Sequence, residues 1–499
     1  NIGKMYGLGF DFIYHDGAEG MPQSNVGIAI IRRAIFRALP RPATVEASAW
    51  DYFSWPFHSR IGAWDSPSWG MKQLADVHIT SNKAYSASLL PTQLGWWAIR
   101  GLSTTNYPQL PDEFEYVAFK GMANDMAMSL QGISVGSAPP NIRQPEFFSI
   151  LRNCEMIRRN NSLLPSTINK VSLQTPGIEY HIDGDVLSGK WKLLPASYPS
   201  AIIQSSTGGG SVSLSNKFSS QPIRLRVQAL FSVSPANTAS RLTLVSFQST
   251  TEFSTPTSSK NASLSFSIST TVKPPSGGAT RSGKLTFING QPTRTASWGS
   301  IVRTFPTELD LSKTAALGLW VYGDGKGEVI NLQPVSPSEW TNAIEDHYIV
   351  VDFIGWKWIE MPLIERSSED YGKYKWPYGM WQSVYISGPY WNHISLLKIW
   401  IGNAPERSTC TVYLGPILAL PVVNALITSP MITVGDKTLS FPGLVLEGGS
   451  YVEFIAENNC HVFRAKSQNT TVSKTGESGL PTVETGVNTI KVSFHISPA

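Results

Sequence analysis

The first third of the chain alternates short apolar runs with amphipathic segments. Residues 7–16, "GLGFDFIYHD", have the pattern of a buried strand, and residues 25–39 carry apolar residues at the spacing of an amphipathic helix. Further strands are predicted at 43–50, 75–81, 93–101 and 126–134, and a closing helix at 146–161. This alternation is typical of a parallel α/β sheet, of which the (β/α)8 barrel is the best-known form.

Roughly five strands are predicted where a (β/α)8 barrel needs eight. Residues 1–164 are therefore interpreted as the C-terminal, catalytic part of such a barrel. An open barrel would expose unpaired backbone groups at its edges. We therefore expect a partner, either an N-terminal barrel segment or a second subunit, to supply the missing strands and pack against residues 5–15 and 126–134.

After residue 165 the pattern changes to alternating apolar and polar positions, which is typical of strands. Residues 165–300 are rich in Ser, Thr and Gly, yet "PIRLRVQALFSV" and "SLSFSIST" alternate as the strands of a β-sandwich do. A second sandwich is predicted at 301–425 and a small terminal one at 426–499. The predicted fold class is thus α/β plus all-β, a partial (β/α)8-like barrel followed by two or three β-sandwich, jelly-roll domains.

A resemblance to a known fold lies in the segments "LGLWVYGDGKGE", "VVDFIGWKWIEMPL" and "IWIGNAPERSTCTVYLGPI". In strand order and in their GDG and GW turns, these segments resemble the galactose-binding-like jelly roll of carbohydrate-binding modules and glycosidase accessory domains. The tight Gly-Asp-Gly at Asp324 predicts a turn between two strands and favours a hairpin. Trp356 and Trp358, two residues apart in a strand, are predicted to share one face.

Composition narrows the class of protein. Of 499 residues, 41% are hydrophobic, 15% charged and 11% aromatic, with 16 Trp, which suits both sugar-stacking sites and sandwich cores. The net charge of +4 comes without a basic stripe, so a nucleic-acid partner is not expected. No apolar run is long enough for a membrane span, and no signal-peptide pattern begins the sequence, which suggests a processed chain.

Metal and cofactor motifs are also missing from the sequence. Cys154, Cys410 and Cys460 lie far apart without CxxC spacing, so no zinc site is predicted; a Cys410–Cys460 disulfide and three free thiols remain open. There is no dinucleotide, P-loop or HExxH motif and no serine nucleophile elbow. No cofactor is therefore expected.

Two carboxylates follow the first predicted strand, in "FDFIYHDGAEG". Charged groups at the end of a buried strand are costly unless they are hydrogen-bonded, and in barrels the carboxyl ends of the strands form the active face. Glycoside hydrolysis needs two such carboxyl groups, one to protonate the leaving oxygen and one to attack or to activate water. Asp16, Glu19, Glu46 and Asp65 are the candidates, although Asp16 and Glu19 would also serve as caps of the helix at 25–39.

A second resemblance concerns "HSRIGAWDSPSWG" at 58–70, which resembles the Arg-Asp-Trp segment of the retaining α-galactosidase-like clan of glycosidases. The clan's Lys-x-Asp ahead of the nucleophile is absent here. The resemblance implies Asp16 as nucleophile and Asp65 as acid/base. Glu46, which ends the next predicted strand, is the leading substitute.

Aromatic and basic residues near these carboxylates fit a sugar pocket. Aromatic faces stack on the apolar faces of pyranoses, and cationic groups bind hydroxyls, a uronate or a sulfate. His78 is placed at a strand end, and Lys120 is equally consistent with a surface helix. The predicted substrate-binding residues are His15, Trp50, Trp55, His58, Arg60, Trp64, His78, Trp97 and Lys120.

These observations predict a glycoside hydrolase that is secreted, to the periplasm or the cell exterior, and cleaves a polysaccharide or oligosaccharide. One alternative is a polysaccharide lyase acting on a uronate-containing glycan, with Tyr14, His15, His58 and Arg60 as its base and charge-neutralising groups. Another is a non-catalytic carbohydrate-binding or surface-assembly protein. The sugar, the linkage and the stereochemical outcome stay open.

Overall fold

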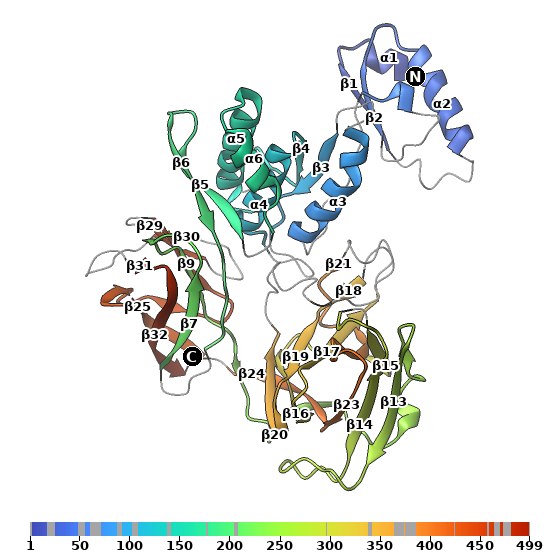
Figure 1. The fold of residues 1–499 in the computed structure, drawn as a ribbon, viewed down its shortest axis with the longest axis vertical. Coiled ribbons are helices and arrows are strands. Elements are labelled where there is room, and N and C mark those ends of the chain that lie inside the picture. The colour runs from blue at the N-terminus through green and yellow to red at the C-terminus, as the bar shows by residue number, and fades with distance from the viewer. Residues whose placement is uncertain are drawn as a thin grey trace. The chain divides into compact units, whose positions relative to one another are not determined.

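The structure is a computed structural model of the 499-residue chain. It describes residues 2–16, 25–47, 55–59, 71–86, 92–101, 108–136, 141–175, 178–203, 208–295, 297–337, 342–363, 374, 386–423, 425–456, 459–463, 470–472 and 481–498. The chain divides into two compact units (Figure 1). The first contains Asn1–Gly101 and Pro108–Ser197, and the second contains Leu102–Tyr107 and Tyr198–Ala499.

The first unit is built from alternating helices and strands. Its elements are α1 (Ile2–Tyr6), β1 (Phe12–His15), α2 (Asn25–Arg37), β2 (Thr44–Ala47), η2 (Trp55–Phe57), α3 (Met71–Ser86), β3 (Gln93–Ala98), α4 (Pro111–Ala123), β4 (Ala127–Gln131), α5 (Gln144–Asn160), α6 (Pro165–Ser172), β5 (Glu179–Asp185) and β6 (Lys190–Ala196). β1 pairs with β2 and β3 with β4, both in parallel, and β5 and β6 form an antiparallel hairpin. The described strands therefore make two short parallel sheets, and a closed (β/α)8 barrel is not shown.

The strand predicted at 75–81 is wrong, because these residues lie inside helix α3. The alternation in "ADVHITS" is short, and the longer window decides the structure. Buried positions recur along α3 at the three- and four-residue spacing of one helix face, at Met71, Leu74, Ala75, His78, Ile79 and Asn82. His78 is therefore part of a buried helix face and not at the end of a strand.

A buried ion pair joins α3 to the hairpin. Lys72 Nζ donates to Glu179 Oε1 at 2.7 Å, and the two side chains are 0% and 2% exposed. Beside this pair, the hydroxyl of Tyr116 in α4 donates to the carboxylate of Asp76 at 2.9 Å. Burial of the hydroxyl, and after it the negative charge of Asp76, raises the pKa of Tyr116 far above its usual range. The helices α3 and α4 and strand β5 are thus held together by polar contacts as well as by packing.

The larger part of the second unit is a β-sandwich. Its strands are β10 (Ser232–Val233), β11 (Leu242–Val245), β12 (Thr257–Ser258), β13 (Ala262–Ser269), β14 (Ser282–Asn289), β15 (Trp298–Leu309), β16 (Thr314–Asp324), β17 (Glu328–Ser336), β18 (Asn342–Ile344), β19 (His347–Val351), β20 (Ile354–Pro362), β21 (Ile386–Ser387), β22 (Ile394–Gly402), β23 (Ser408–Leu414) and β24 (Ile417–Val423). An eight-stranded sheet runs β10-β24-β16-β23-β14-β13, with β11 beside β24 and β20 beside β16. A seven-stranded sheet runs β12-β15-β22-β17-β18-β21, with β19 beside β17.

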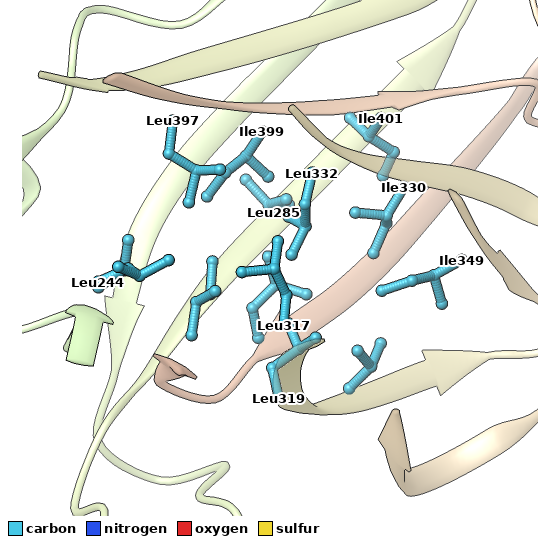
Figure 2. Packing of buried hydrophobic residues seen from close by; sticks show 14 of the residues in the cluster. Leu244, Leu285, Leu317, Leu319, Ile330, Leu332, Ile349, Leu397, Ile399 and Ile401 are labelled. Atoms are coloured by element: carbon cyan, nitrogen blue, oxygen red, sulfur yellow. The ribbon is translucent and has the colours of Figure 1, made fainter. Parts of the chain in front are cut away.

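The core of this sandwich lies between the two sheets. Alternate residues of β16 and β17 point inward, including Leu317 and Leu319 from one sheet and Ile330 and Leu332 from the other, all fully buried. Figure 2 shows such side chains gathered between the ribbons of the two sheets. The period-two alternation sorts apolar side chains into this core, although β17 is buried on both faces, with Asn331 and Gln333 turned to the outer one.

The Gly-Asp-Gly turn lies between two strands, as predicted, but it does not form a hairpin. Asp324 ends β16 in the eight-stranded sheet, and Glu328 begins β17 in the seven-stranded sheet. Gly325 and Gly327 have φ of +77° and +76°, which favours glycine. The turn therefore carries the chain from one layer of the sandwich to the other, a connection that local sequence does not distinguish from a hairpin.

The strands of a second, smaller sandwich come from the sequence segments before and after the large sandwich. Its strands are β7 (Gly209–Asn216), β8 (Gln221–Pro222), β9 (Leu225–Gln228), β25 (Ala425–Val434), β26 (Lys437–Ser440), β27 (Val445–Leu446), β28 (Tyr451–Ala456), β29 (Asn459–Phe463), β30 (Thr470–Val472), β31 (Thr482–Val483) and β32 (Gly486–Pro498). β7 pairs with β32 and β9 with β28, so residues 232–423 are inserted between early and late strands of this sandwich. Its core includes Ile432, Phe441 and Phe454.

Candidate functional site

Two of the four predicted carboxylates, Asp16 and Glu46, lie in the described residues, on the adjacent parallel strand segments of β1 and β2. The parallel register places Tyr14 opposite Glu46, so these two side chains share one face. Glu46 is fully buried, whereas Asp16 follows β1 directly and is exposed. The Tyr14 ring also packs edge-on against Trp96 of β3, with 4.4 Å between ring centroids. The structure thus brings Glu46 close to the strand end that carries Asp16.

The segment after η2 returns to the same sheet. The backbone N–H of Ser59 donates to Val45 O at 2.7 Å, and the Val45 N–H donates to Ser59 Oγ at 3.0 Å. These reciprocal bonds hold the buried His58 next to the strand that carries Glu46. His58 thus lies beside strand β2, and its predicted contact with a substrate stays a prediction.

His15 points the other way. It is opposite Ala47 in the register, and alternation turns its side chain to the face opposite Tyr14 and Glu46. Burial lowers the pKa of His15, and the Arg32 charge lowers it further. The placement of His15 with α2 does not favour the predicted contact with substrate.

Acidification is expected to destabilise the first unit through His15. The pKa of His15 in the folded chain is below the 6.5 of the unfolded chain. Between these two values the unfolded chain binds a proton that the folded chain does not, so stability is present above pH 6.5 and is lost as the pH falls. Unfolding free energies at neutral and mildly acidic pH should differ less for His15→Gln than for the wild type. The exposed His393 supplies the control, His393→Gln, and equal pH dependence in all three proteins would refute the assignment.

The remaining predicted residues lie elsewhere or outside the described residues. Trp97 is 1% exposed and its indole N–H donates to Leu94 O at 3.0 Å, so it is a core residue. Lys120 of α4 is buried, pairs with Asp76 at 2.9 Å and donates to Ser172 O at 3.2 Å, which engages its ammonium among the helices. Trp55 is in η2. Glu19, Trp50, Arg60, Trp64 and Asp65 lie outside the described residues.

A cluster of aromatic side chains lies on the outer face of the eight-stranded sheet. This aromatic face consists of Trp320 and Tyr322 from β16, Trp356 and Trp358 from β20, and Tyr413 from β23. The antiparallel register places Trp320 opposite Trp358 and Tyr322 opposite Trp356 and Tyr413. All of these side chains are half-buried. Trp356 and Trp358 therefore share one face, and this prediction is confirmed.

The aromatic rings pack edge-on in two groups, a pair of Trp320 with Trp358 and a trio in which Tyr322 contacts Trp356 and Tyr413. Ring centroids are 5.7 Å apart for Trp320 and Trp358, 5.5 Å for Tyr322 and Trp356, and 5.7 Å for Tyr322 and Tyr413. Gly318 makes room for this arrangement, because an added Cβ would lie 2.8 Å from an atom of the Trp358 ring. Packing of each ring against its neighbours restricts its rotamers, so the surface is preorganised.

Polar groups border the aromatic face. The Trp358 indole N–H donates to Glu360 Oε1 at 2.8 Å, and Lys284 Nζ of β14 lies 5.9 Å from the centre of the Tyr413 ring. A carboxylate and an ammonium beside apolar ring faces supply both acceptor and donor groups for a hydroxylated ligand. Sequence analysis missed Trp320, Tyr322 and Tyr413 as candidates, although the two-residue spacing of Trp320 and Tyr322 was a usable signal.

The outer face of the seven-stranded sheet is also aromatic and polar. Asn331 and Gln333 donate to Asp346 Oδ1 at 2.8 and 2.6 Å, and the Tyr348 hydroxyl donates to Asp346 Oδ2 at 2.8 Å. Asn331 and Gln333 are 0% exposed, and Trp400 is 7% exposed. Among the described residues, these polar side chains therefore bond to one another.

Comparisons with known proteins give only distant likenesses. No family model and no curated protein matches the chain. The solved structures it resembles include a family 11 carbohydrate-binding module from Clostridium thermocellum in complex with a β-1,3-1,4-mixed-linked tetrasaccharide, at 16% identity and a TM-score of 0.26, covering 36% of this chain and 95% of the other. A family 30 carbohydrate-binding module matches at 13% identity and a TM-score of 0.22, and the match covers 37% of this chain and 88% of the module. An exo-β-agarase matches at 14% identity and a TM-score of 0.24, and the match covers 36% of this chain but only 25% of the agarase. At these identities and TM-scores, the likenesses assign neither a family nor a ligand.

Proposed function

We propose that this chain is a secreted carbohydrate-active protein whose large sandwich, residues 232–423, binds a glycan on the aromatic face. The observation that carries the proposal is the set of half-buried aromatic rings that three adjacent strands, β20, β16 and β23, place on one face of the sheet. Sugar rings present apolar C–H faces that pack on aromatic rings, and their hydroxyls bond to flanking polar groups such as Glu360 and Lys284. Neighbouring strands lie about 4.8 Å apart, so three strands form a surface about 10 Å wide.

Binding of soluble polysaccharides tests this proposal. Titration calorimetry or affinity electrophoresis with a panel of soluble neutral and uronate-containing glycans should find at least one ligand for the wild type. Trp358→Ala should weaken that ligand's binding at least tenfold, about 1.4 kcal/mol, because truncated aromatic anchors dominate interface energies. Tyr390, which is exposed and lies outside the aromatic face, provides the control Tyr390→Ala. If no glycan binds, or if both variants bind as the wild type does, the sandwich is not a glycan-binding surface.

A second function is favoured by the position of Asp16 and Glu46 at one end of adjacent parallel strands. The first unit is proposed to be part of a (β/α)8-like barrel with glycosidase activity, Asp16 acting as nucleophile or base and Glu46 or Asp65 as the second carboxyl group. Release of reducing ends distinguishes this function from binding alone. A lyase would instead yield a product with the absorbance of an unsaturated uronate. The strands that complete the barrel are proposed to come from a segment or subunit outside the described residues.

A further inference from the structure

A carboxylate, a second carboxylate and a thiol converge where β16, β17 and β23 meet in the large sandwich (Figure 1). They belong to Asp324, Glu328 and Cys410, and one ligand atom from each lies within 4.8 Å of the other two. Asp324 ends β16, Glu328 begins β17 and Cys410 lies inside β23, so the group spans both sheets. Asp324 and Glu328 lie four residues apart, but Cys410 is distant from both in sequence, so cysteine spacing alone predicted no metal site.

Glu328 is the unusual member of this group. Its side chain is 0% exposed, and neither carboxylate oxygen accepts a hydrogen bond from a described residue outside this group. Burial raises the pKa of Glu328 to about 7, and the neighbouring Asp324 carboxylate adds to the effect. A buried carboxyl group without donors is costly unless a ligand satisfies it.

Cys410 has the same surroundings. It is a free cysteine, 0% exposed. Burial raises the pKa of its thiol to about 12, with the Glu328 charge as the second cause. Two acidic groups buried side by side repel one another when both are charged, and a cation bound between them offsets that repulsion.

We propose that Asp324, Glu328 and Cys410 form a binding site for a divalent cation of the zinc class. A thiolate with two carboxylates suits Zn²⁺, Co²⁺ or Cd²⁺, whereas Ca²⁺ and Mg²⁺ prefer oxygen ligands alone. Zn²⁺ at such a site takes four ligands, so one further ligand, such as water, would complete the coordination. On binding, the Cys410 thiol and the fraction of Glu328 that is protonated release their protons to water.

The surrounding charges balance such an ion. Lys326 Nζ lies 3.4 Å from Asp324 Oδ2, and that oxygen also accepts the Thr411 N–H at 2.8 Å. Two carboxylates and a thiolate carry three negative charges, which a divalent cation and the Lys326 ammonium neutralise. From the outer side, Arg294 Nη2 donates to Gly327 O at 2.8 Å and fixes the turn that separates Asp324 from Glu328. The ligands are therefore held by backbone contacts that do not depend on the metal.

The position of the site suggests a structural role. The turn from Asp324 to Glu328 carries the chain between the two sheets, and a bound ion would join the end of β16, the start of β17 and the middle of β23. Metal binding to the folded chain stabilises it by mass action. The site lies in the same sandwich as the aromatic face, but none of its ligands belongs to that face.

Equilibrium dialysis of the full-length, chelator-treated chain against Zn²⁺ tests the proposal. The wild type should bind one Zn²⁺ that Glu328→Gln and Cys410→Ser bind at least about 100-fold more weakly, because loss of a direct ligand exceeds the effect of changing an outer-shell partner. Cys154→Ser removes the other buried free thiol, in α5, and should bind as the wild type does. If the wild type binds no Zn²⁺, or if all variants bind alike, the proposal is refuted.

A spectroscopic arm covers the case in which Cys410→Ser fails to fold. The chain has three cysteines, so Cys154→Ser with Cys460→Ser leaves Cys410 as the single thiol. Addition of Co²⁺ to this double variant should produce a thiolate-to-cobalt charge-transfer band in the near ultraviolet and visible d–d bands of tetrahedral intensity. The band should disappear when Glu328→Gln is added. A folded double variant that gives no charge-transfer band would also overturn the assignment of Cys410 as a ligand.

Discussion

Asp16→Asn is expected to lower glycosidase turnover by about 10³-fold or more, with little change in stability. The reason is that a nucleophile or general base cannot be replaced by an amide, and loss of a catalytic carboxylate removes stabilisation that exists only in the transition state. Asp16 is exposed at the carboxyl end of β1, so its replacement leaves no cavity. Release of reducing ends from an active substrate measures the loss, and thermal unfolding checks the fold.

The chain offers a matched control at the other end of the same strand. Asp11 precedes β1, is also exposed, and pairs with Arg41. Asp11→Asn changes the same functional group at the amino end of the strand, where barrel chemistry does not take place. Its turnover should equal that of the wild type. Similar turnover in Asp16→Asn and Asp11→Asn would remove Asp16 from the mechanism.

The second carboxyl group can be assigned in the same assay. Glu46→Gln and Asp65→Asn change the two candidates one at a time. The variant that loses turnover as Asp16→Asn does identifies the partner. For retention the two carboxyl groups lie roughly 5–5.5 Å apart, and for inversion roughly 6.5–9.5 Å, so the configuration of the product then gives their separation.

Lys72→Met is expected to destabilise the first unit by about 3–5 kcal/mol, because it leaves the carboxylate of Glu179 buried without its cation. The ion pair is 2.7 Å long and both side chains are almost fully buried. Lys72→Met combined with Glu179→Leu should recover much of the loss, since buried pairs are often replaced by apolar residues at little cost. If the double variant is as unstable as Lys72→Met, the unpaired carboxylate of Glu179 is not the cause of the destabilisation.

An exposed pair in the same unit is the comparison. Arg152 of α5 pairs with Asp185 of β5 at 2.7 Å, but these side chains are 47% and 42% exposed. Arg152→Met should cost less than about 1 kcal/mol, because water screens exposed pairs. The chain has two units, so a single unfolding transition is not assumed. Hydrogen exchange of the α3 and β5 amides reports on the first unit directly. Equal loss of protection in Lys72→Met and Arg152→Met would contradict the role of burial.

The sequence predicted most strongly where the period of the apolar residues was long and unbroken. The helices at α2 and α5 and the strands β1, β2, β3 and β4 lie where the pattern placed them. In the large sandwich, alternation predicted the shared face of Trp356 and Trp358. It failed at 75–81, where a short alternating run lies inside the helix α3, because its seven residues fit both periods and only packing of the whole helix face decided between them.

The sequence by itself determined the elements: an α/β first part, alternating strands in the sandwich, and the position of Asp16 after the first strand. It did not determine burial: β1, predicted as a buried strand, is exposed or half-buried, and β17 is buried on both faces. Only the tertiary structure decided which strands pair, because a period-two pattern marks a buried face without naming its partner. That choice placed β7 and β9 with the last strands of the chain and gathered Trp320, Trp358 and Tyr413 into one surface. It also brought Cys410 to Asp324 and Glu328, a meeting that depends on long-range strand order and that no local pattern records.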